Sequence, residues 1–365
     1  MADKAYRLQA MSFRERQTRE GITSRITEFF ASNKFLITVF ILCLATLATV
    51  YRPDSNGINL EGQTNRLEFQ IRSRALRRAS WDTFVDTSKP SRRRSPFSRP
   101  RRAFVSSLHT ADYFPLSLAM GYSLVQTNDI AAQNTEMVLF VRKSANISTA
   151  SLDKLQKIGW KLRIEDDIVL QNVDIEQIRP GHRWNLNKIR FWSWTEYDQI
   201  LFIDSDTLVK GDLSDVWKTP GSTHPTRINL TIVIAAAPDA WEHTTKDLYF
   251  NSGVLLLRPS LIEYDLLLRG ISTPGMHLPH EGDQPFLNRF YEYRHFGLPH
   301  TYNLNLVLYQ WYPVIWKFLW PKAKVVHFTV RKPGPPARWC VVDCPERVVL
   351  EWYADVFTEM LEQYG

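Results

Sequence analysis

The sequence predicts an α/β fold built on a mostly parallel sheet. Short apolar runs typical of buried strands alternate with helical patterns across residues 103–361, as in parallel sheets covered by helices. The central run, Ile200–Ile203, has no charge and indicates a strand buried on both faces. It ends on Asp204-Ser205-Asp206, and the carboxyl ends of strands are where open α/β sheets bind ligands.

The expected elements follow in chain order. A first strand is expected at the short apolar run 103–107, and a helix from Tyr113 to Leu124, whose apolar residues follow a period of about 3.6. The same reasoning gives the remaining elements. Strands are expected at 137–141, 200–203, 231–236, 253–257 and 324–328, and helices at 151–158, 185–194 and 349–361.

Composition divides the chain into a basic N-terminal third and a mildly acidic remainder. The 365 residues are 44% hydrophobic and 13% aromatic, which is ample for one large core or two domains. Residues 1–102 hold 20 Lys and Arg against 9 Asp and Glu, whereas 103–365 hold 25 against 29. A nucleic-acid-binding domain carries its basic patch on the fold, so this distribution argues against nucleic acid as a partner.

The three cysteines, Cys43, Cys340 and Cys344, are too few for a disulfide scaffold, and their spacing suits no zinc site. Cys340 and Cys344 are either a local disulfide in an oxidising lumen or two buried free thiols. Both states remain open.

The N-terminal region predicts a membrane anchor. Residues 1–34 are polar and basic, and residues 35–51 contain no charge, a length at the short end for a transmembrane helix that suits a thin, early-secretory bilayer. More Lys and Arg flank the N-terminal side than the C-terminal side, which places residues 1–34 in the cytosol and the bulk of the chain in the lumen. A cleaved signal peptide is the rival interpretation, but its n-region would be long. A single-pass type II protein of the Golgi or another secretory-pathway membrane is expected.

Residues 52–102 predict a disordered basic stem. They lack a sustained apolar period and end in an Arg-, Ser- and Pro-rich run, a composition that buries too little surface to fold. The folded domain is therefore expected to span residues 103–365.

The Asp204-Ser205-Asp206 motif predicts a metal site. Side chains at i and i+2 of an extended segment point the same way, so both carboxylates are able to aim at one point. They repel each other unless a cation lies between them. A solvated turn after a strand is the simpler alternative for an isolated motif of this kind.

Four motifs in order then give a resemblance: 201–208 (LFIDSDTL), 250–254 (FNSGV), 282–284 (GDQ) and 325–328 (VVHF). Together they resemble glycosyltransferase family 8, the glycogenin-like retaining enzymes of the GT-A fold, over roughly 103–332. The resemblance implies a Rossmann-like nucleotide-diphospho-sugar transferase domain that uses Mn²⁺. It implies transfer of a hexose, N-acetylhexosamine or hexuronic acid from a UDP-sugar to a glycan, protein or lipid acceptor.

The resemblance also implies roles for particular residues. Asp204, Asp206 and His327 would hold the metal, and Asp283 and Gln284 would form the reaction centre, as nucleophile or as stabiliser of an oxocarbenium-like state. The UDP-sugar would contact a larger set, in which only Tyr113 among the first four keeps the family's residue. That set is Ser107, His109, Thr110, Tyr113, Lys188, Asp204, Ser205, Asp206, Asp239, Asn251, Ser252 and Lys332.

One loop departs from the family pattern. Val330 stands where the family has glycine, and Lys332 arrives one residue early and is followed by Pro333-Gly334 in place of Pro-Trp. Val330 lacks the backbone freedom of glycine, so the loop that closes on the diphosphate must differ in shape. A catalytically inactive member that binds glycans or acts as a scaffold is therefore the alternative function. A cytosolic, self-glucosylating glycogen primer conflicts with the expected anchor.

Overall fold

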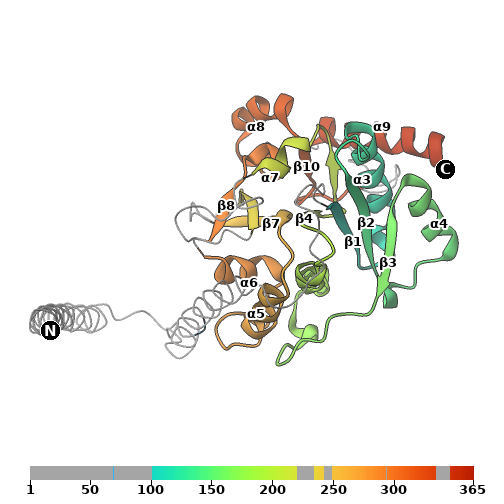
Figure 1. Ribbon diagram of the computed structural model, residues 1–365. Helices are drawn as coiled ribbons and strands as arrows, with labels where there is room; N and C mark the ends of the chain where they lie inside the picture. The colour runs from blue at the N-terminus through green and yellow to red at the C-terminus, as the bar shows by residue number, and fades with distance from the viewer. Residues whose placement is uncertain (1–68, 70–100, 220–233, 242–248, 293, 334–345) are drawn as a thin grey trace, which may run out of the picture. The chain divides into compact units, whose positions relative to one another are not determined.

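The computed structural model describes residues 69, 101–219, 234–241, 249–292, 294–333 and 346–365, all within the compact unit Leu60–Gly365. Its main feature is a seven-stranded sheet in the order β3-β2-β1-β4-β7-β6-β8 (Figure 1). In chain order the strands are β1 Arg102–Leu108, β2 Thr135–Arg142, β3 Lys161–Glu165, β4 Gln199–Ile203, β6 Ile234–Pro238, β7 Phe250–Leu257 and β8 His295–Gly297.

The sheet is mostly parallel. Strands β3, β2, β1 and β4 all run in one direction, and β6 is parallel to β8. Strand β7 is antiparallel to both of its neighbours, β4 and β6. The predicted α/β fold with a mostly parallel central sheet is confirmed. Because β7 runs the opposite way, Val254 lies opposite Ile203, the last residue of β4. Gly253, one residue earlier in β7, therefore lies beside Asp204, which follows β4.

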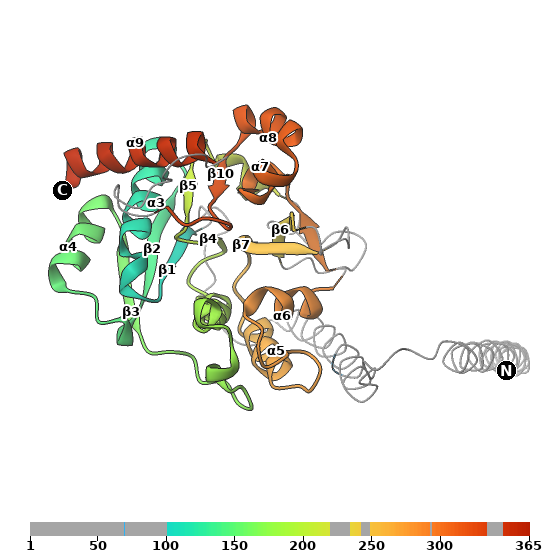
Figure 2. The same cartoon turned by 180° about the vertical axis from the view of Figure 1, so that it is seen from behind.

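Helices cover both faces of this sheet (Figures 1 and 2). One face carries α3 Phe114–Thr127, α4 Thr149–Ile158 and α9 Arg347–Tyr364, and the other carries the 3₁₀ helix η5 Asn185–Ser193 with α5 Leu261–Ile271 and α6 Asp283–Phe290. Successive residues of β4 belong alternately to the two cores, Leu201 to the first and Phe202 to the second. This burial on both faces explains why the strand reads as a continuous apolar run.

Local sequence explains several boundaries. Ser148 caps α4 by accepting a hydrogen bond from the Ser151 amide, and Gly159 ends the helix with φ 120°, a conformation that favours glycine. The segment predicted as a helix at 185–194 is instead the 3₁₀ helix η5. The shorter 3₁₀ helices are η1 Ala111–Tyr113, η2 Lys143–Ala145, η3 Ile175–Gln177, η4 Pro180–His182, η6 Ser214–Lys218, η7 His300–Tyr302 and η8 Trp320–Lys322.

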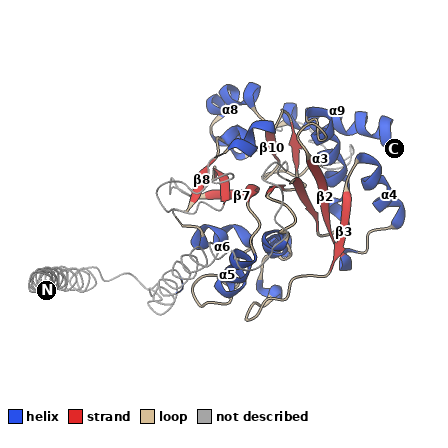
Figure 3. Cartoon of the chain, in the orientation of Figure 1, coloured by secondary structure: helices blue, strands red, loops and turns tan. Residues whose placement is uncertain are grey.

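A second, three-stranded sheet lies beside the first (Figure 3) and has the order β5-β10-β9. Its strands are β5 Thr207–Val209, β9 Leu304–Asn305 and β10 Val325–His327, and the helices α7 Val307–Trp311 and α8 Pro313–Leu319 connect β9 to β10. Strand β10 pairs antiparallel with β5, so that His327 lies opposite Thr207. This pairing brings a histidine from late in the chain next to the Asp-Ser-Asp motif.

The predicted cytosolic tail, membrane segment and nearly all of the predicted stem lie outside the described residues, as do Cys43, Cys340 and Cys344. Across the ranges that are described, no helix combines the length and apolarity needed to cross a bilayer. From the expected stem, Phe69 is described, and its ring lies 5.9 Å from that of Phe290. Strand β1 begins at Arg102, one residue before the expected domain boundary.

Candidate active site

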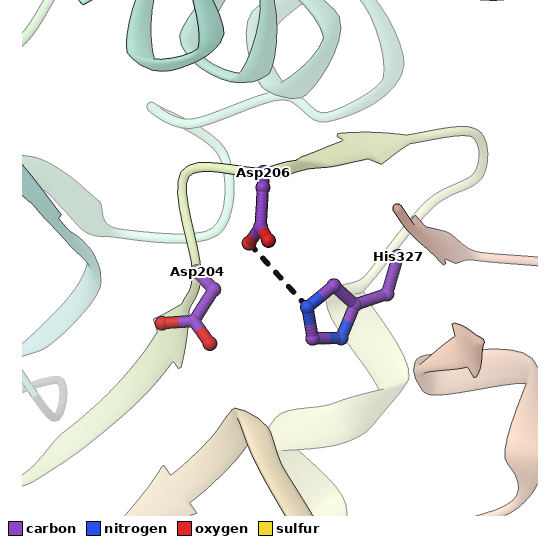
Figure 4. Close-up of side chains that lie close together, drawn as sticks. All are labelled: Asp204, Asp206 and His327. Atoms are coloured by element: carbon purple, nitrogen blue, oxygen red, sulfur yellow. Dashed lines mark ion pairs between the residues drawn. The ribbon is translucent and has the colours of Figure 1, made fainter. Parts of the chain in front are cut away.

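Asp204, Asp206 and His327 converge at the edge where β4 ends and β5 meets β10 (Figure 4). One ligand atom from each side chain lies within 4.8 Å of those from the other two. Backbone hydrogen bonds hold the arrangement, because the Asp204 amide donates to the Gly253 carbonyl at 2.8 Å and the Phe328 amide donates to the Asp206 carbonyl at 3.0 Å. The two aspartates therefore aim at one point, as their spacing predicts.

The orientation of His327 follows from a chain of hydrogen bonds. The Gly253 amide and the Asn303 side-chain amide both donate to Asn251 Oδ1, each at 2.9 Å. Asn303 therefore presents its Oδ1 to His327 Nδ1, 2.9 Å away, and this acceptor requires a proton on Nδ1. The lone pair of His327 is then on Nε2, which lies 3.4 Å from Asp206 Oδ1.

The protonation states at this point suit a cation. Burial lowers the pKa of His327 to about 4, so the imidazole is neutral at pH 7 and its contact with Asp206 is not an ion pair. Burial also raises the pKa of Asp204. An imidazole lone pair and two carboxylates facing one another are all acceptors, and a divalent cation would satisfy them together. Two oxygen ligands and one nitrogen ligand fit a hard divalent ion such as Mg²⁺ or Mn²⁺.

Gly253 makes this geometry possible. A Cβ atom at this position would lie 2.3 Å from His327 Cε1 and 2.9 Å from Asn251 Oδ1. Any larger residue would displace the imidazole from the aspartates, so the glycine of the Asn-Ser-Gly motif is needed for close approach.

A buried cation, Lys188, lies beside the cluster. Its Nζ is 2.7 Å from Asp283 Oδ2, 3.5 Å from Asp204 Oδ1 and 2.9 Å from the Ser252 carbonyl oxygen. The side chain is only 2% exposed and lies over the Phe202 ring. Burial alone would lower the pKa of Lys188, but Asp204 and Asp283 outweigh it and raise the pKa. Lys188 is therefore charged and buried. It is not a solvent-exposed lysine on the surface of η5.

Asp283 is held as an anion at the start of α6. Burial would raise its pKa, but Lys188 and a 2.8 Å hydrogen bond from the Ser252 hydroxyl outweigh burial and lower the pKa. Asp283 is the first residue of α6, and the helix dipole further favours a negative charge there. Both contacts use Oδ2, so Oδ1 is the oxygen available to a ligand.

Gln284, which is predicted to belong to the reaction centre, contacts a residue predicted to meet the donor sugar. Its Oε1 accepts a hydrogen bond from the Ser252 amide at 3.0 Å, and its Nε2 donates to Asp239 Oδ2 at 2.7 Å. Asp239 Oδ1 in turn accepts from Asn251 Nδ2 at 3.2 Å. The structure thus joins Asp239, Asn251, Ser252 and Gln284 in one hydrogen-bonded network.

The four residues predicted to hold the nucleotide lie at the end of β1, with Ser107 in the strand and His109, Thr110 and Tyr113 just after it. Ser107 is buried in the strand, and Thr110 accepts a hydrogen bond from the Tyr113 amide through its backbone carbonyl. Burial and the charge of Asp204 raise the pKa of Tyr113. Burial, with the charge of Lys188 as the next cause, lowers the pKa of His109 to about 3. The charge of Asp204 therefore reaches Tyr113, and the charge of Lys188 reaches His109.

The loop after His327 reaches back to the aspartates. Lys332 Nζ contacts Asp206 Oδ2, and burial lowers the pKa of Lys332 to about 8. Lys332 lies within reach of the carboxylate pair although its position in the sequence departs from the family pattern. The loop beyond Pro333 lies outside the described residues.

Ser205, between the two aspartates in the sequence, is buried.

Sequence reasoning missed Asn303, which fixes the His327 tautomer, and Asn305. Both asparagines are buried, and Asn305 Oδ1 accepts from the Val307 amide at 3.0 Å and also contacts Thr329 Oγ1. The available signal was an Asn-Leu-Asn run within an apolar stretch, since a buried polar side chain requires a partner.

The parallel sheet, the antiparallel β7 and the carboxylate-histidine cluster define a GT-A-like nucleotide-sugar transferase fold. The family model described as Glycosyl transferase family 8 matches residues 105–333. This match spans more than half of the chain, and the chain belongs to glycosyl transferase family 8.

Similarity to individual proteins agrees with this membership. Human glycogenin-1 is 29% identical over 293 residues, which are 72% of this chain and 75% of that protein. UDP-glucuronate:xylan alpha-glucuronosyltransferase 2 of Arabidopsis thaliana is 28% identical over 207 residues, which are 56% of this chain and 30% of the plant protein. The chain therefore matches less than a third of the length of that relative.

Among solved structures, the galactosyltransferase LgtC in complex with donor and acceptor sugar analogues aligns with a TM-score of 0.49 and 16% identity. The alignment covers 70% of this chain and 95% of LgtC.

Proposed function

We propose that this protein is a metal-dependent, retaining glycosyltransferase that moves a sugar from a UDP-sugar to a glycan, protein or lipid acceptor. The observation that supports this proposal is the contact between the Asp204, Asp206 and His327 cluster and the Lys188 and Asp283 pair, since Lys188 Nζ lies 3.5 Å from Asp204 Oδ1. A divalent cation bound by the cluster would act as a Lewis acid on the diphosphate leaving group. Mn²⁺ is the ion proposed, because one ligand is a nitrogen.

The chain's own residues define what happens on the sugar side. Lys188 and Ser252 keep Asp283 ionised and orient it through Oδ2, so that Oδ1 can face the anomeric carbon. A carboxylate in this position either attacks that carbon or stabilises positive charge on the sugar ring. Gln284, held at both ends of its amide, contributes a fixed dipole beside it.

The choice of candidate donor sugars rests on the relatives and on the charge of the site. The plant relative is named for UDP-glucuronate, and the cationic Lys188 lies at the reaction centre together with Lys332 across the cluster. The donors to compare are therefore UDP-glucuronate, UDP-glucose, UDP-galactose and UDP-N-acetylglucosamine.

The test is a donor-hydrolysis screen of the purified full-length chain with these UDP-sugars in the presence of Mn²⁺, with and without EDTA. Release of UDP from one donor, abolished by EDTA, supports the proposal and names the donor. UDP release that is equal with and without a divalent ion would contradict the metal role.

The contact between Lys332 and Asp206 supports a second candidate function. An internal ammonium on one aspartate neutralises part of the charge that would otherwise require a metal ion, and this occurs in the loop that departs from the family pattern. The chain would then be an inactive member that binds sugars or acts as a scaffold. In the same screen, saturable UDP-sugar binding with no UDP release from any donor would favour this function.

We also propose a secretory-pathway location, with residues 35–51 as a type II anchor and the family domain in the lumen. Support comes from the uncharged run and its basic N-terminal flank. The side chain of Asn146, in an Asn-Ile-Ser acceptor sequence, is exposed, so it would be open to lumenal glycosylation. Protection of the domain from protease in intact microsomes tests the topology, and digestion without detergent would contradict it.

A further inference from the structure

The outer face of α8 is apolar and exposed. Val314 is 80% exposed, Phe318 66% and Ile315 46%, and their spacing places them on neighbouring positions of one helical surface. Trp311 and Tyr312, just before α8, are also large and exposed. Figures 1 and 2 show α7 and α8 together at the margin of the domain, next to β10.

The core does not need these side chains. Helix α8 is anchored through its opposite face by Trp316, which is buried and lies 5.4 Å from both the Tyr309 and the Trp320 rings. Trp320 packs in turn on Trp352 of α9. An exposed apolar patch that the fold does not require marks an interaction surface.

The charged side chains of the chain segment that carries the patch have one sign. The sequence contains no Asp or Glu between Glu292 and Asp343, and the exposed Lys317 and Lys322 lie within and just after α8. Lys322 Nζ lies 4.1 Å from the centre of the Phe318 ring. Within the described ranges neither lysine pairs with a carboxylate, whereas Lys324 does, with Asp215.

An apolar face bordered by lysines suits some binding partners better than others. A second copy docking face to face would bring the same lysines together, which like-charge repulsion opposes. A glycan would need hydrogen-bonding groups across its contact surface. Trp311 and Tyr312 offer them only at one end of the patch, and Val314, Ile315 and Phe318 offer none from their side chains. An anionic lipid surface fits both features, since aliphatic and aromatic side chains enter the acyl boundary while lysines remain at the headgroups.

We propose that the outer face of α8, formed by Val314, Ile315 and Phe318 and bordered by Lys317 and Lys322, docks on an anionic phospholipid surface. The apolar side chains supply insertion, and each lysine adds attraction to the negative headgroups. This docking holds the family domain against a bilayer independently of any anchor elsewhere in the chain, and it does not depend on the proposed transfer activity.

The test uses the full-length chain with its three cysteines changed to serine and one cysteine introduced for a fluorescent label. Val314→Cys reports the patch. Val169→Cys is the matched control, because Val169 is 89% exposed and lies on a loop outside the patch. Each protein is reconstituted in vesicles of phosphatidylcholine alone or mixed with phosphatidylserine, and quenching by lipids brominated in the acyl chain is measured.

The expected result is quenching at position 314 that requires phosphatidylserine, with none at position 169. Lys317→Gln and Lys322→Gln should each lower the ratio of docked to free domain about fivefold. Phe318→Ser should lower it on the order of tenfold, without changing the circular dichroism melt, since the side chain is mostly exposed.

Three results would overturn the proposal. One is equal quenching at positions 314 and 169. Another is quenching at 314 that is unchanged by phosphatidylserine and by both lysine substitutions. The third is protection of position 314 from a water-soluble quencher in lipid-free detergent that grows with protein concentration, which would assign the face to a second copy of the chain.

Discussion

Two neighbouring groups of charged side chains at the same edge of the sheet are built differently. In the Lys188 and Asp283 pair every charge has a partner, because the ammonium meets Asp283, Asp204 and a backbone carbonyl. In the Asp204, Asp206 and His327 cluster three acceptors face one another. Each aspartate also has one ammonium contact, Asp206 with Lys332 and Asp204 with Lys188 at 3.5 Å. The pair therefore needs no further partner, whereas the three acceptors of the cluster still lack a cation that they can share. Substitution in the pair should lower the free energy of unfolding, and substitution in the cluster should lower turnover.

The largest expected effect on stability comes from breaking the pair. Lys188→Met leaves the buried Asp283 carboxylate without its main partner, and the free energy of unfolding should fall by about 3–5 kcal/mol. Urea denaturation of wild type and variant measures the loss. The double variant Lys188→Met/Asp283→Asn should recover part of it, and a double variant as unstable as the single one would show that the pair is not the cause.

Substitution in the cluster should act on turnover and leave stability nearly unchanged. Asp206→Asn relieves the repulsion between two carboxylates but also removes the partner of Lys332, so the metal-free protein should melt close to the wild-type temperature. UDP release should fall on the order of 10²-fold or more, because a metal ligand at the leaving group is lost. The measurement pairs a thermal melt in EDTA with Mn²⁺-dependent turnover. Wild-type turnover in this variant would show that Asp206 is not a ligand.

A smaller effect is expected from the hydrogen bonds behind the cluster. Asn303→Ala removes the acceptor that keeps the proton on His327 Nδ1, and the affinity for Mn²⁺ should fall about 10- to 100-fold. Isothermal titration with Mn²⁺ measures this change. Asn128→Ala is the matched control, because it also removes a buried asparagine side chain, one that bonds to the backbone of Gly211 and Leu213 and not to the cluster. It should leave the Mn²⁺ affinity unchanged.

The smallest effect concerns His109, which lies within the field of Lys188. Its pKa is lowered to about 3 in the folded chain, below the ordinary value of about 6.5 in the unfolded chain. The neutral imidazole therefore contributes stability that is complete above about pH 6.5 and is lost as the pH falls toward 3. When the pH falls from 7 to 5, the free energy of unfolding of His109→Gln should decrease by about 1–2 kcal/mol less than that of wild type. Parallel losses in the two proteins would show that His109 is already charged at pH 5.

The parts of the site that could be predicted from sequence are those with a local pattern. Ile200–Ile203 is followed by two carboxylates, because a strand buried on both faces must be apolar and must end in a polar loop, and both features are visible within residues 200–206. His327 was placed through the resemblance and not through its own neighbours. Its proximity to Asp206 depends on the pairing of β10 with β5, which joins residues 120 positions apart.

Other features had no local signal. Strand β7 has the same composition as a parallel strand, so its antiparallel direction was not predictable from its residues. Asn303 reads as a loop residue until it is known to contact both Asn251 and His327. The 3₁₀ geometry of η5 likewise depends on tertiary packing, since its apolar spacing also suits an α-helix.

The central claim is that the cluster of Asp204, Asp206 and His327 holds a divalent cation, and direct Mn²⁺ binding tests it most simply. Electron paramagnetic resonance follows the signal of free Mn²⁺ as it is titrated with the full-length chain and UDP, for wild type and for Asp206→Asn. Wild type should remove about one Mn²⁺ per chain from solution, as one cluster of three ligands requires, and Asp206→Asn should remove far less at the same concentration. Equal binding by the two proteins, or none by wild type, would contradict the metal site.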